Sequence, residues 1–216
     1  MRTKPPYFGH PEGHVPTYSQ GGEDTRIAEL FARRGILKAS LLDIGAWDPF
    51  DKSNSRLLLE GGWWGILVEP SPGAVRTLLD EYGDDETIKV IAAAVMPAGT
   101  AAKFSPLHIT DDAVSTTSAA VHETWKQLGG YFGRLWCPTI TLSDIFNQFG
   151  GDFQFVNIDA EGVSVDLAIE YLRTEAYPAV LCVEHDGRTV ELMQCAQERG
   201  YLASHLNGTN IILEHR

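Results

Sequence analysis

The feature that most constrains this fold is a repeated alternation between short apolar runs and amphipathic helical segments. Helical patterns at 51–60, 71–82, 165–172 and 189–199 follow four of the runs. Near-continuous apolar strands that alternate with helices are typical of a parallel sheet covered on both faces. We therefore predict one α/β domain with a doubly wound, Rossmann-like, mostly parallel sheet. Five runs read as its buried strands: 40–45, 64–70, 89–95, 153–159 and 179–185.

Other segments fall outside this alternation. Residues 1–18 are rich in Pro and Gly and predict an irregular N-terminal arm, ahead of a single domain at 19–216. Residues 101–138 are rich in Thr, Ser, Gly and aromatic side chains, and we expect an insertion near the active face. The last apolar stretches surround Asn207-Gly208 and predict an antiparallel C-terminal hairpin.

Composition narrows the classes of partner. The 216 residues include 17 Lys and Arg against 29 Asp and Glu, a net charge of −12, which argues against nucleic acid or an anionic membrane as partner. The longest apolar run, 90–96, is too short to span a bilayer, and no secretory signal is visible. Three cysteines without metal-ligand spacing indicate neither a disulfide framework nor a zinc site. We expect a cytoplasmic protein, and the sequence leaves its oligomeric state open.

Carboxylates gather where the predicted strands end. Ligands of doubly wound sheets bind at these carboxyl ends. Four of the five ends carry an acid, and the glycine after the first strand lets a ligand approach the backbone. The acid that ends the second strand stands where a carboxylate accepts both ribose hydroxyls of a nucleoside. These four acids are Asp43, Glu69, Asp159 and Glu184.

The loop after the first predicted strand indicates which kind of nucleoside could bind. It lacks the GxGxxG pattern of dinucleotide sites, and its two acids, Asp43 and Asp48, would repel a pyrophosphate. A cationic nucleoside without phosphates suits it, and S-adenosylmethionine is such a molecule. A module that binds this nucleoside without turnover is an alternative function, and an NAD-dependent oxidoreductase is disfavoured. In the plainest alternative, Asp43 caps a turn and Glu69 is a solvated strand end.

Several segments also resemble a known enzyme family. They are YSQGGED at 18–24, LLDIGAWDPFDKSNS at 41–55, GGWWGILVEPSP at 61–72, VSTTS at 114–118, NIDAEG at 157–162 and CVEHD at 182–186. Together they look like FkbM-type methyltransferases, which are class I S-adenosylmethionine-dependent enzymes. The resemblance implies O-methyl transfer to a hydroxyl group of a sugar, glycan or polyketide-like small molecule.

The resemblance also implies a set of cofactor-binding positions. Among them, Glu69 holds the ribose, Pro70 and Ser71 lie beside the adenine, and Asp159 lies nearest the sulfonium. The others surround the methionine part. The full set is Asp43, Gly45, Ala46, Ser53, Asn54, Glu69, Pro70, Ser71 and Asp159.

Two devices could activate the acceptor hydroxyl. His185, oriented by a neighbouring carboxylate, could act as a general base. Alternatively, Asp159, Glu184 and His185 could hold a divalent cation such as Mg²⁺ that lowers the hydroxyl pKa. The candidate catalytic residues are therefore Asp159, Glu161 and His185. Two features depart from the family pattern: no acid follows Gly162 closely, and the third strand ends without one.

Overall fold

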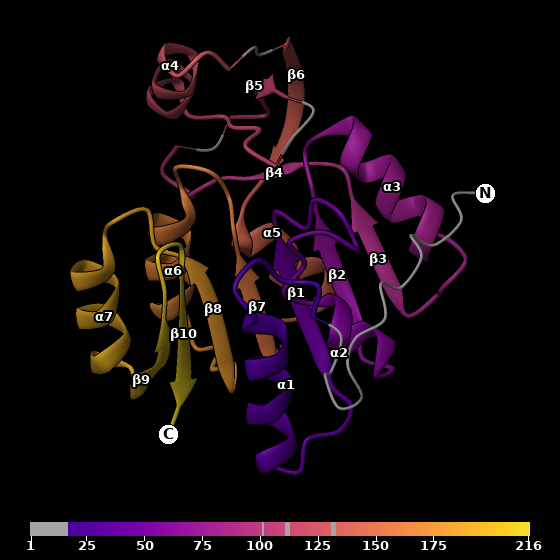
Figure 1. Cartoon of the computed structure of the whole chain (residues 1–216), viewed down its shortest axis with the longest axis vertical. Helices are drawn as coiled ribbons and strands as arrows, with labels where there is room; N and C mark the ends of the chain where they lie inside the picture. Colours follow the sequence, from indigo (N-terminus) through magenta and orange to yellow (C-terminus); the bar gives the residue numbers. More distant parts are fainter. Residues whose placement is uncertain (1–16, 101, 111–112, 131–132) are drawn as a thin grey trace.

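The central feature of the fold is a seven-stranded sheet with the order β3-β2-β1-β7-β8-β10-β9 (Figure 1). The computed structural model describes residues 17–100, 102–110, 113–130 and 133–216. Strands β3 to β8 of this order pair in parallel, and β10 runs antiparallel to both β8 and β9. The predicted fold class, with its antiparallel C-terminal hairpin, is confirmed. The strands are β1 (Ser40–Ile44), β2 (Trp64–Val68), β3 (Ile88–Ile91), β7 (Phe155–Ile158), β8 (Val180–Glu184), β9 (Tyr201–Leu206) and β10 (Asn210–His215).

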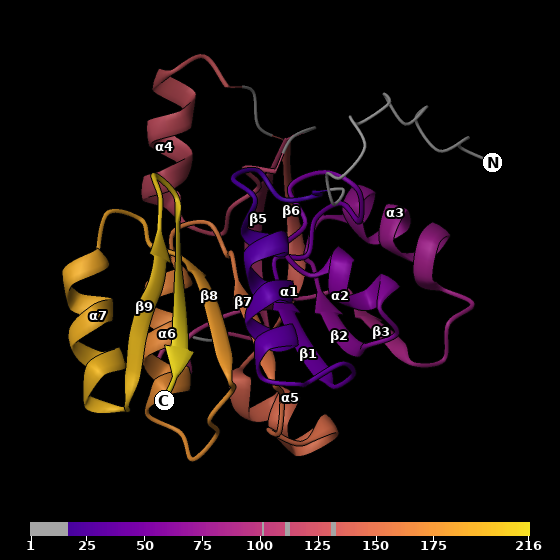
Figure 2. The same ribbon diagram turned by 60° about the horizontal axis from the view of Figure 1, so that its bottom comes forward.

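Helices cover both faces of this sheet. One apolar cluster packs the first face against α1 (Glu23–Arg33), α2 (Arg56–Glu60) and α3 (Pro72–Tyr82). A second cluster packs the other face against α5 (Leu142–Phe149), α6 (Ser164–Leu172) and α7 (Thr189–Glu198). Figure 2 shows α1 and α6 on opposite sides of the strands. The central strands are buried on both faces, which explains their continuous apolar runs.

The order of the strands reverses between β1 and β7. From β1 the chain builds outward to β2 and β3, and it then returns to place β7 on the other side of β1. A crevice opens at the carboxyl ends of the strands at such a switch point. The loops that follow β1 and β7 are therefore expected to line a ligand site.

A smaller sheet stands beyond these carboxyl ends. It has the order β4-β6-β5 and is accompanied by α4, and both views place β5, β6 and α4 at one end of the main sheet (Figures 1 and 2). None of the α4 side chains is buried among the described residues. The segment 101–138, predicted to be an insertion, contains β5, α4 and part of β6. The bounds are β4 (Ala94–Val95), β5 (Phe104–Ile109), α4 (Ala119–Gln127) and β6 (Gly133–Ile140).

Three local expectations differ from the structure. The predicted third strand, 89–95, is divided into β3 and β4, because a tight turn in which Ala93 N donates to Ile91 O moves the chain to the second sheet. The helix expected from residue 51 begins at Arg56, since the preceding loop is held by side-chain contacts described below. Helix α5 was not expected, although Thr141 and Asp144 form a capping box at its start.

The described chain begins shortly before α1. Tyr18 N donates to Asp24 Oδ2 over 2.7 Å, which ties the chain before α1 to that helix. Residues 1–16, most of the predicted arm, lie outside the described residues. In the part of the chain that the structure describes, no helix is long and apolar enough to cross a membrane.

Candidate functional site

A cavity of about 370 Å³ opens at the switch point of the sheet. Its floor comes from the ends of β1, β2, β7 and β8 and from the beginning of β10. Its roof comes from residues 113–117 and from Trp125 of α4. Among the described residues that line it are Gln20, Gly45, Trp47, Lys52, Asn54, Glu69, Pro70, Ala93, Leu107, Thr116, Asp159, Glu161, Glu184 and Asn210.

The middle of the floor depends on a glycine. Gly45 has a φ of 82°, and a Cβ atom added there would lie 1.7 Å from the Asp159 carbonyl oxygen. Only a residue without a side chain allows the loops after β1 and β7 to approach this closely. Trp47, two residues later, also has a left-handed backbone, with a φ of 45°. This rare conformation for a large residue marks the loop as locally strained.

Glu69 is anchored by the backbone at one end of the cavity. Its Oε1 accepts from Ser71 N over 2.7 Å, and its Oε2 accepts from Trp47 N over 3.1 Å. The side chain is 4% exposed, and burial raises its pKa to about 7 despite these two bonds. Asp43 and Asp159 raise the pKa further through charge repulsion. Glu69 is thus a fixed acceptor at a strand end, which is the geometry that binding of paired hydroxyl groups requires.

Beside Glu69 the cavity wall is apolar. Pro70 follows Glu69 directly, while Ala93, Val95 and the fully buried Leu107 come from the turn after β3 and from the small sheet. The acid that the sequence lacks at the end of its third predicted strand is therefore replaced by small aliphatic side chains. Such a wall suits a flat heteroaromatic ring better than a charged group.

A buried polar network supports the floor from below. Asp43 Oδ2 accepts from Ser55 Oγ, and Asp43 Oδ1 accepts from Asn157 Nδ2 over 2.8 Å. Asn54 Nδ2 in turn donates to Asn157 Oδ1 over 3.0 Å. Burial raises the pKa of Asp43, although its two hydrogen bonds offset part of that effect. Asp43 is therefore held beneath the loop and is not among the described residues that line the cavity.

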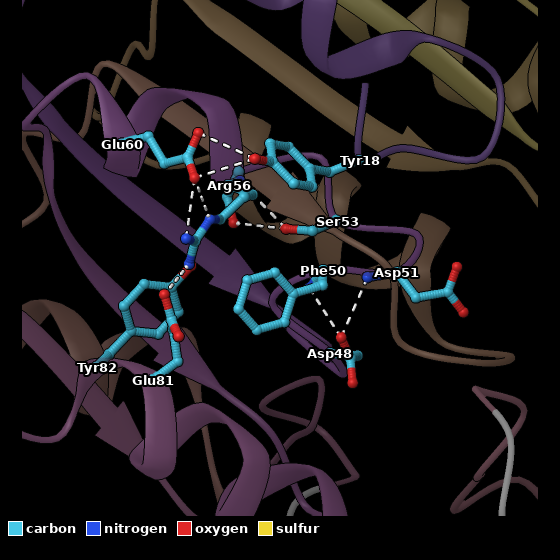
Figure 3. Close-up of polar contacts among 10 residues, drawn as sticks. Tyr18, Asp48, Phe50, Asp51, Ser53, Arg56, Glu60, Glu81 and Tyr82 are labelled. Carbon is cyan, nitrogen blue, oxygen red and sulfur yellow. Dashed lines mark hydrogen bonds and ion pairs between the residues drawn. The ribbon is translucent and has the colours of Figure 1, made fainter. Parts of the chain in front are cut away.

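Arg56 clamps the loop between β1 and α2 (Figure 3). Its side chain is 6% exposed and forms ion pairs with Glu60 and, over 2.7 Å, with Glu81 Oε1. It also donates to Tyr82 Oη over 2.9 Å, and its guanidinium lies 4.7 Å from the centre of the Phe50 ring. These partners come from α2, from α3 and from the loop itself. One buried cation thus joins the loop to two helices.

Two further contacts fix the same loop. Asp48 Oδ1 accepts from the backbone N–H groups of Phe50 and Asp51, and Ser53 N donates to Tyr18 O over 3.1 Å. Ser53 Oγ accepts from Arg56 N at the start of α2 (Figure 3). Ser53 therefore supports the cavity without lining it.

Three acids gather near the centre of the cavity. Asp159, Glu161 and Glu184 each offer a carboxylate oxygen, and these atoms all lie within 4.8 Å of one another. Burial raises the pKa of Asp159, and a hydrogen bond with Glu184 opposes this effect. Burial and then the charge of Asp159 raise the pKa of Glu184. The pair therefore shares a proton near neutral pH, with Glu184 as its donor.

His185 does not join this group. Its Nδ1 accepts from Gly187 N and its Nε2 lies 3.1 Å from Asn207 O, so both ring nitrogens are bound to backbone groups of neighbouring turns. It is also not among the residues that line the cavity. The structure thus does not bring His185 to the cavity, and its roles as general base and as metal ligand stay predictions. The residue after a strand end points to the opposite face from the strand-end residue, here Glu184, and only one of the two can face the cavity.

The roof is tied to the acidic centre. Thr116 Oγ1 donates to Glu161 O over 2.8 Å and accepts from Ser118 N. Gly162 has a φ of 86°, and a Cβ atom there would lie 2.7 Å from Val121 of α4. Glu161 and Gly162 thus support the start of α4, so the roof is in direct contact with the acidic centre.

The structure brings together only part of the predicted cofactor set. Five of its members line the cavity: Gly45, Asn54, Glu69, Pro70 and Asp159. Ala46, Ser53, Asp43 and Ser71 lie behind the wall, where Ser71 supports Glu69. The roles of all nine in binding a cofactor stay predictions.

Other residues of the site were not expected. Asn210 is one of them, and it stands at the first position of β10 opposite Glu184 of β8. Because β10 is antiparallel, its beginning lies at the same edge as the carboxyl ends of the parallel strands. The sequence predicts the hairpin that contains Asn210, but the rule that places ligands at carboxyl ends applies to parallel strands and does not indicate the start of an antiparallel one. Other polar or aromatic side chains of this kind at the cavity include Gln20, Trp47, Lys52 and Thr209.

Comparisons with known proteins yield matches among solved structures alone. No family profile matches the chain, and no curated protein shows a significant match. Among solved structures, a Pyrococcus horikoshii protein provisionally assigned as an RNA methyltransferase is 12% identical, with a TM-score of 0.48 over 96% of this chain and 91% of that one. A hypothetical protein of Thermus thermophilus is 16% identical, with a TM-score of 0.48 over 95% and 91%. The precorrin-6y C5,15-methyltransferase of Geobacter metallireducens is 12% identical, with a TM-score of 0.42 over 86% and 84%.

Proposed function

We propose that this protein is an S-adenosylmethionine-dependent methyltransferase of class I. The observation that carries the proposal is the order of groups along the cavity. An apolar wall is followed by the anchored carboxylate of Glu69, then by the Gly45–Asp159 contact, and then by the acidic centre. The first three suit an adenine, a ribose and a cationic methionyl sulfonium in that order, and the acidic centre follows them.

The residues present fit the cofactor. Glu69 would accept the two ribose hydroxyls, and the Ala93 and Val95 wall would contact the adenine. Asp159 would lie near the positively charged methionyl part, which it attracts. When bound, S-adenosylmethionine supplies a methyl group on a sulfonium, and methyl transfer leaves neutral S-adenosylhomocysteine.

The acceptor group in this proposal is a hydroxyl of a small molecule. An alcohol must lose its proton as its oxygen bonds to the methyl carbon, and Asp159 is the ionised member of the proton-sharing pair with Glu184. Asp159 would therefore take that proton. Glu161 and the roof exclude water from the reacting atoms.

Charge favours a small acceptor over a nucleic acid. The cavity is lined by Glu69, Asp159, Glu161 and Glu184 against a single described cation, Lys52. A phosphodiester would be repelled by this lining. Together with the resemblance in the motifs, this favours an FkbM-type O-methyltransferase that acts on a sugar, glycan or polyketide-like hydroxyl.

A divalent cation is the competing device for activating the hydroxyl. Asp159, Glu161 and Glu184 are hard oxygen ligands of the kind that Mg²⁺ prefers, and their spacing fits a metal ion. The proton-sharing pair and a metal ion make opposite predictions, because only the second device depends on an added cation.

Calorimetric titration tests the proposal. We expect S-adenosylmethionine and S-adenosylhomocysteine to bind and NAD not to bind, with Glu69→Ala weakening both at least about 10-fold through loss of two charged hydrogen bonds. Glu29→Ala is the matched control, since Glu29 is exposed on α1 and is not among the described residues that line the cavity. Binding of NAD, or equal binding by wild type and Glu69→Ala, would contradict the assignment. Addition of Mg²⁺ or EDTA to acceptor screens decides between the two devices.

A further inference from the structure

Two buried acceptor oxygens at the far end of the cavity have no hydrogen-bond donor. They are Glu184 Oε2 and Asn210 Oδ1, and no partner for either exists among the described residues. Asn210 is 5% exposed, and both residues line the cavity. A buried acceptor without a donor costs free energy, so natural structures rarely keep one unless a ligand completes it.

The fold places these two oxygens together. Asn210 is the direct cross-strand neighbour of Glu184 in the antiparallel β8–β10 pair, so both side chains leave the sheet on the same face. The orientation of the amide is fixed, because Asn210 Nδ2 donates to Glu23 Oε1 over 3.1 Å. Although burial acts in the opposite direction, this bond and one from Asn207 lower the pKa of Glu23, which keeps it an acceptor. The Asn210 oxygen therefore faces away from Glu23.

These oxygens lie beyond the reach of the proposed cofactor. Glu69 ends β2, and Asn210 begins β10, with β1, β7 and β8 between them. Three strand spacings of about 4.8 Å separate β2 from β8 and four separate it from β10, which amount to roughly 14 and 19 Å; both are longer than the part of S-adenosylmethionine from ribose to amino group. The end of the cavity at β8 and β10 is therefore the acceptor end.

The charge at this end defines its ligand. Glu161 and Asp159 stand beside Glu184, and no basic side chain is among the described residues that line this end. The nearest arginine along the chain, Arg188, is already paired with Asp166 and Glu191. An ammonium group offers three donors and a positive charge, which two unpartnered oxygens and a neighbouring carboxylate can satisfy together.

We propose that Glu184 Oε2 and Asn210 Oδ1 bind a primary ammonium group of the methyl acceptor, so that the acceptor is an amino alcohol such as an amino sugar. This inference rests on the proposed function, because the ammonium serves to place a nearby hydroxyl beside Asp159. Glu184 and Asn210 are binding residues of the acceptor, and Glu23 is a positioning residue that orients Asn210.

Saturation-transfer NMR on the full chain with S-adenosylhomocysteine bound tests this subsite. The probes are methyl β-D-glucosaminide, its N-acetyl derivative and methyl β-D-glucoside at pH 7. They differ only in the group at one carbon, which is cationic in the first alone. We expect the glucosaminide to bind at least about 10-fold more tightly than either neutral probe, because its charged hydrogen bonds are absent from the others.

Two variants and one control separate binding from folding. Asn210→Leu and Glu184→Met, which each remove an acceptor oxygen, should weaken the glucosaminide at least about 10-fold, while S-adenosylhomocysteine binds as in wild type. Asn207→Ser removes the other amide bond to Glu23 but keeps an oxygen for the turn, and it should retain glucosaminide binding.

Three results would overturn the subsite. The three probes could bind equally or not at all, or Asn210→Leu could weaken S-adenosylhomocysteine as much as the glucosaminide. In the third result, Mg²⁺ alone would bind with an affinity that depends on Asn210, which would make the site a metal centre. Failure of wild type to bind S-adenosylhomocysteine would refute the proposed function itself.

Discussion

The two ends of the cavity differ in how completely the protein satisfies its own polar groups. At one end, both oxygens of Glu69 accept backbone N–H groups, from Trp47 and Ser71. At the other end, Glu184 and Asn210 each keep one buried oxygen without a donor among the described residues. The first end is thus complete before any ligand arrives, whereas the second is completed only by one. A preformed end suits an invariant cofactor, and an incomplete end suits the specific acceptor.

Gly45 lies between the two ends of the cavity, and its substitution should have the strongest effect on both cofactor binding and stability. Gly45→Ala forces a Cβ atom against the Asp159 backbone, so we expect loss of S-adenosylhomocysteine binding and a free energy of unfolding lower by about 3 kcal/mol. Denaturant titration and calorimetry measure the two effects. Gly73→Ala is the control, because a Cβ atom at Gly73 meets nothing within 4 Å. Wild-type binding by Gly45→Ala would mean that the two loops need not touch.

A second prediction concerns pH at the preformed end. Burial raises the pKa of Glu69 from 4.5 to about 7, so the folded state holds a proton that the unfolded chain releases. The stability from this group is fully present below about pH 4.5 and is lost as pH rises to about 7. The unfolding free energy of wild type relative to Glu69→Gln should therefore fall by about 3 kcal/mol across this window.

Matched denaturant curves of the two proteins at several pH values measure this difference. Affinity for S-adenosylhomocysteine should rise over the same window, because ribose hydroxyls bind better to the ionised carboxylate. A pH-independent difference between the two proteins would show that Glu69 titrates as an exposed acid does.

At the roof, we expect a smaller effect on the stability of α4. Thr116→Val removes the hydrogen bonds to Glu161 O and from Ser118 N, which should loosen α4 by about 1 kcal/mol. Amide hydrogen exchange in α4 should become several-fold faster, with little change at Glu69. Thr124→Val is the control, since Thr124 bonds only within α4. Equal exchange in both variants would separate the roof from the acidic centre.

Much of the fold could be predicted because periodicity reports burial directly. The central strands β1, β7 and β8 carry near-continuous apolar runs, since both of their faces are covered. The small sheet could not be predicted in this way. Strand β5 and helix α4 bury little, so their apolar residues follow no clear period.

The candidate site could be predicted in part for a related reason. Glu69 and Asp159 come directly after parallel strands, where position along the chain gives position in space. That relation fails at two positions. His185 follows Glu184 by one residue and so has the opposite direction, and Asn210 begins an antiparallel strand. Both depend on which face a side chain takes, and apolar periodicity does not report this for the polar residues at a strand end.

The pairing of β1 with β7 has a consequence for the order of folding. Asp43 and Asn157 bond across this pair although 114 residues separate them in the chain. A contact of such sequence separation forms late, because the long intervening segment must first be closed into a loop. The cavity cannot form before that closure, and its acceptor end also requires β10 to pair with β8. A nucleoside analogue that becomes fluorescent on binding would therefore act as a clock for the last long-range steps of folding.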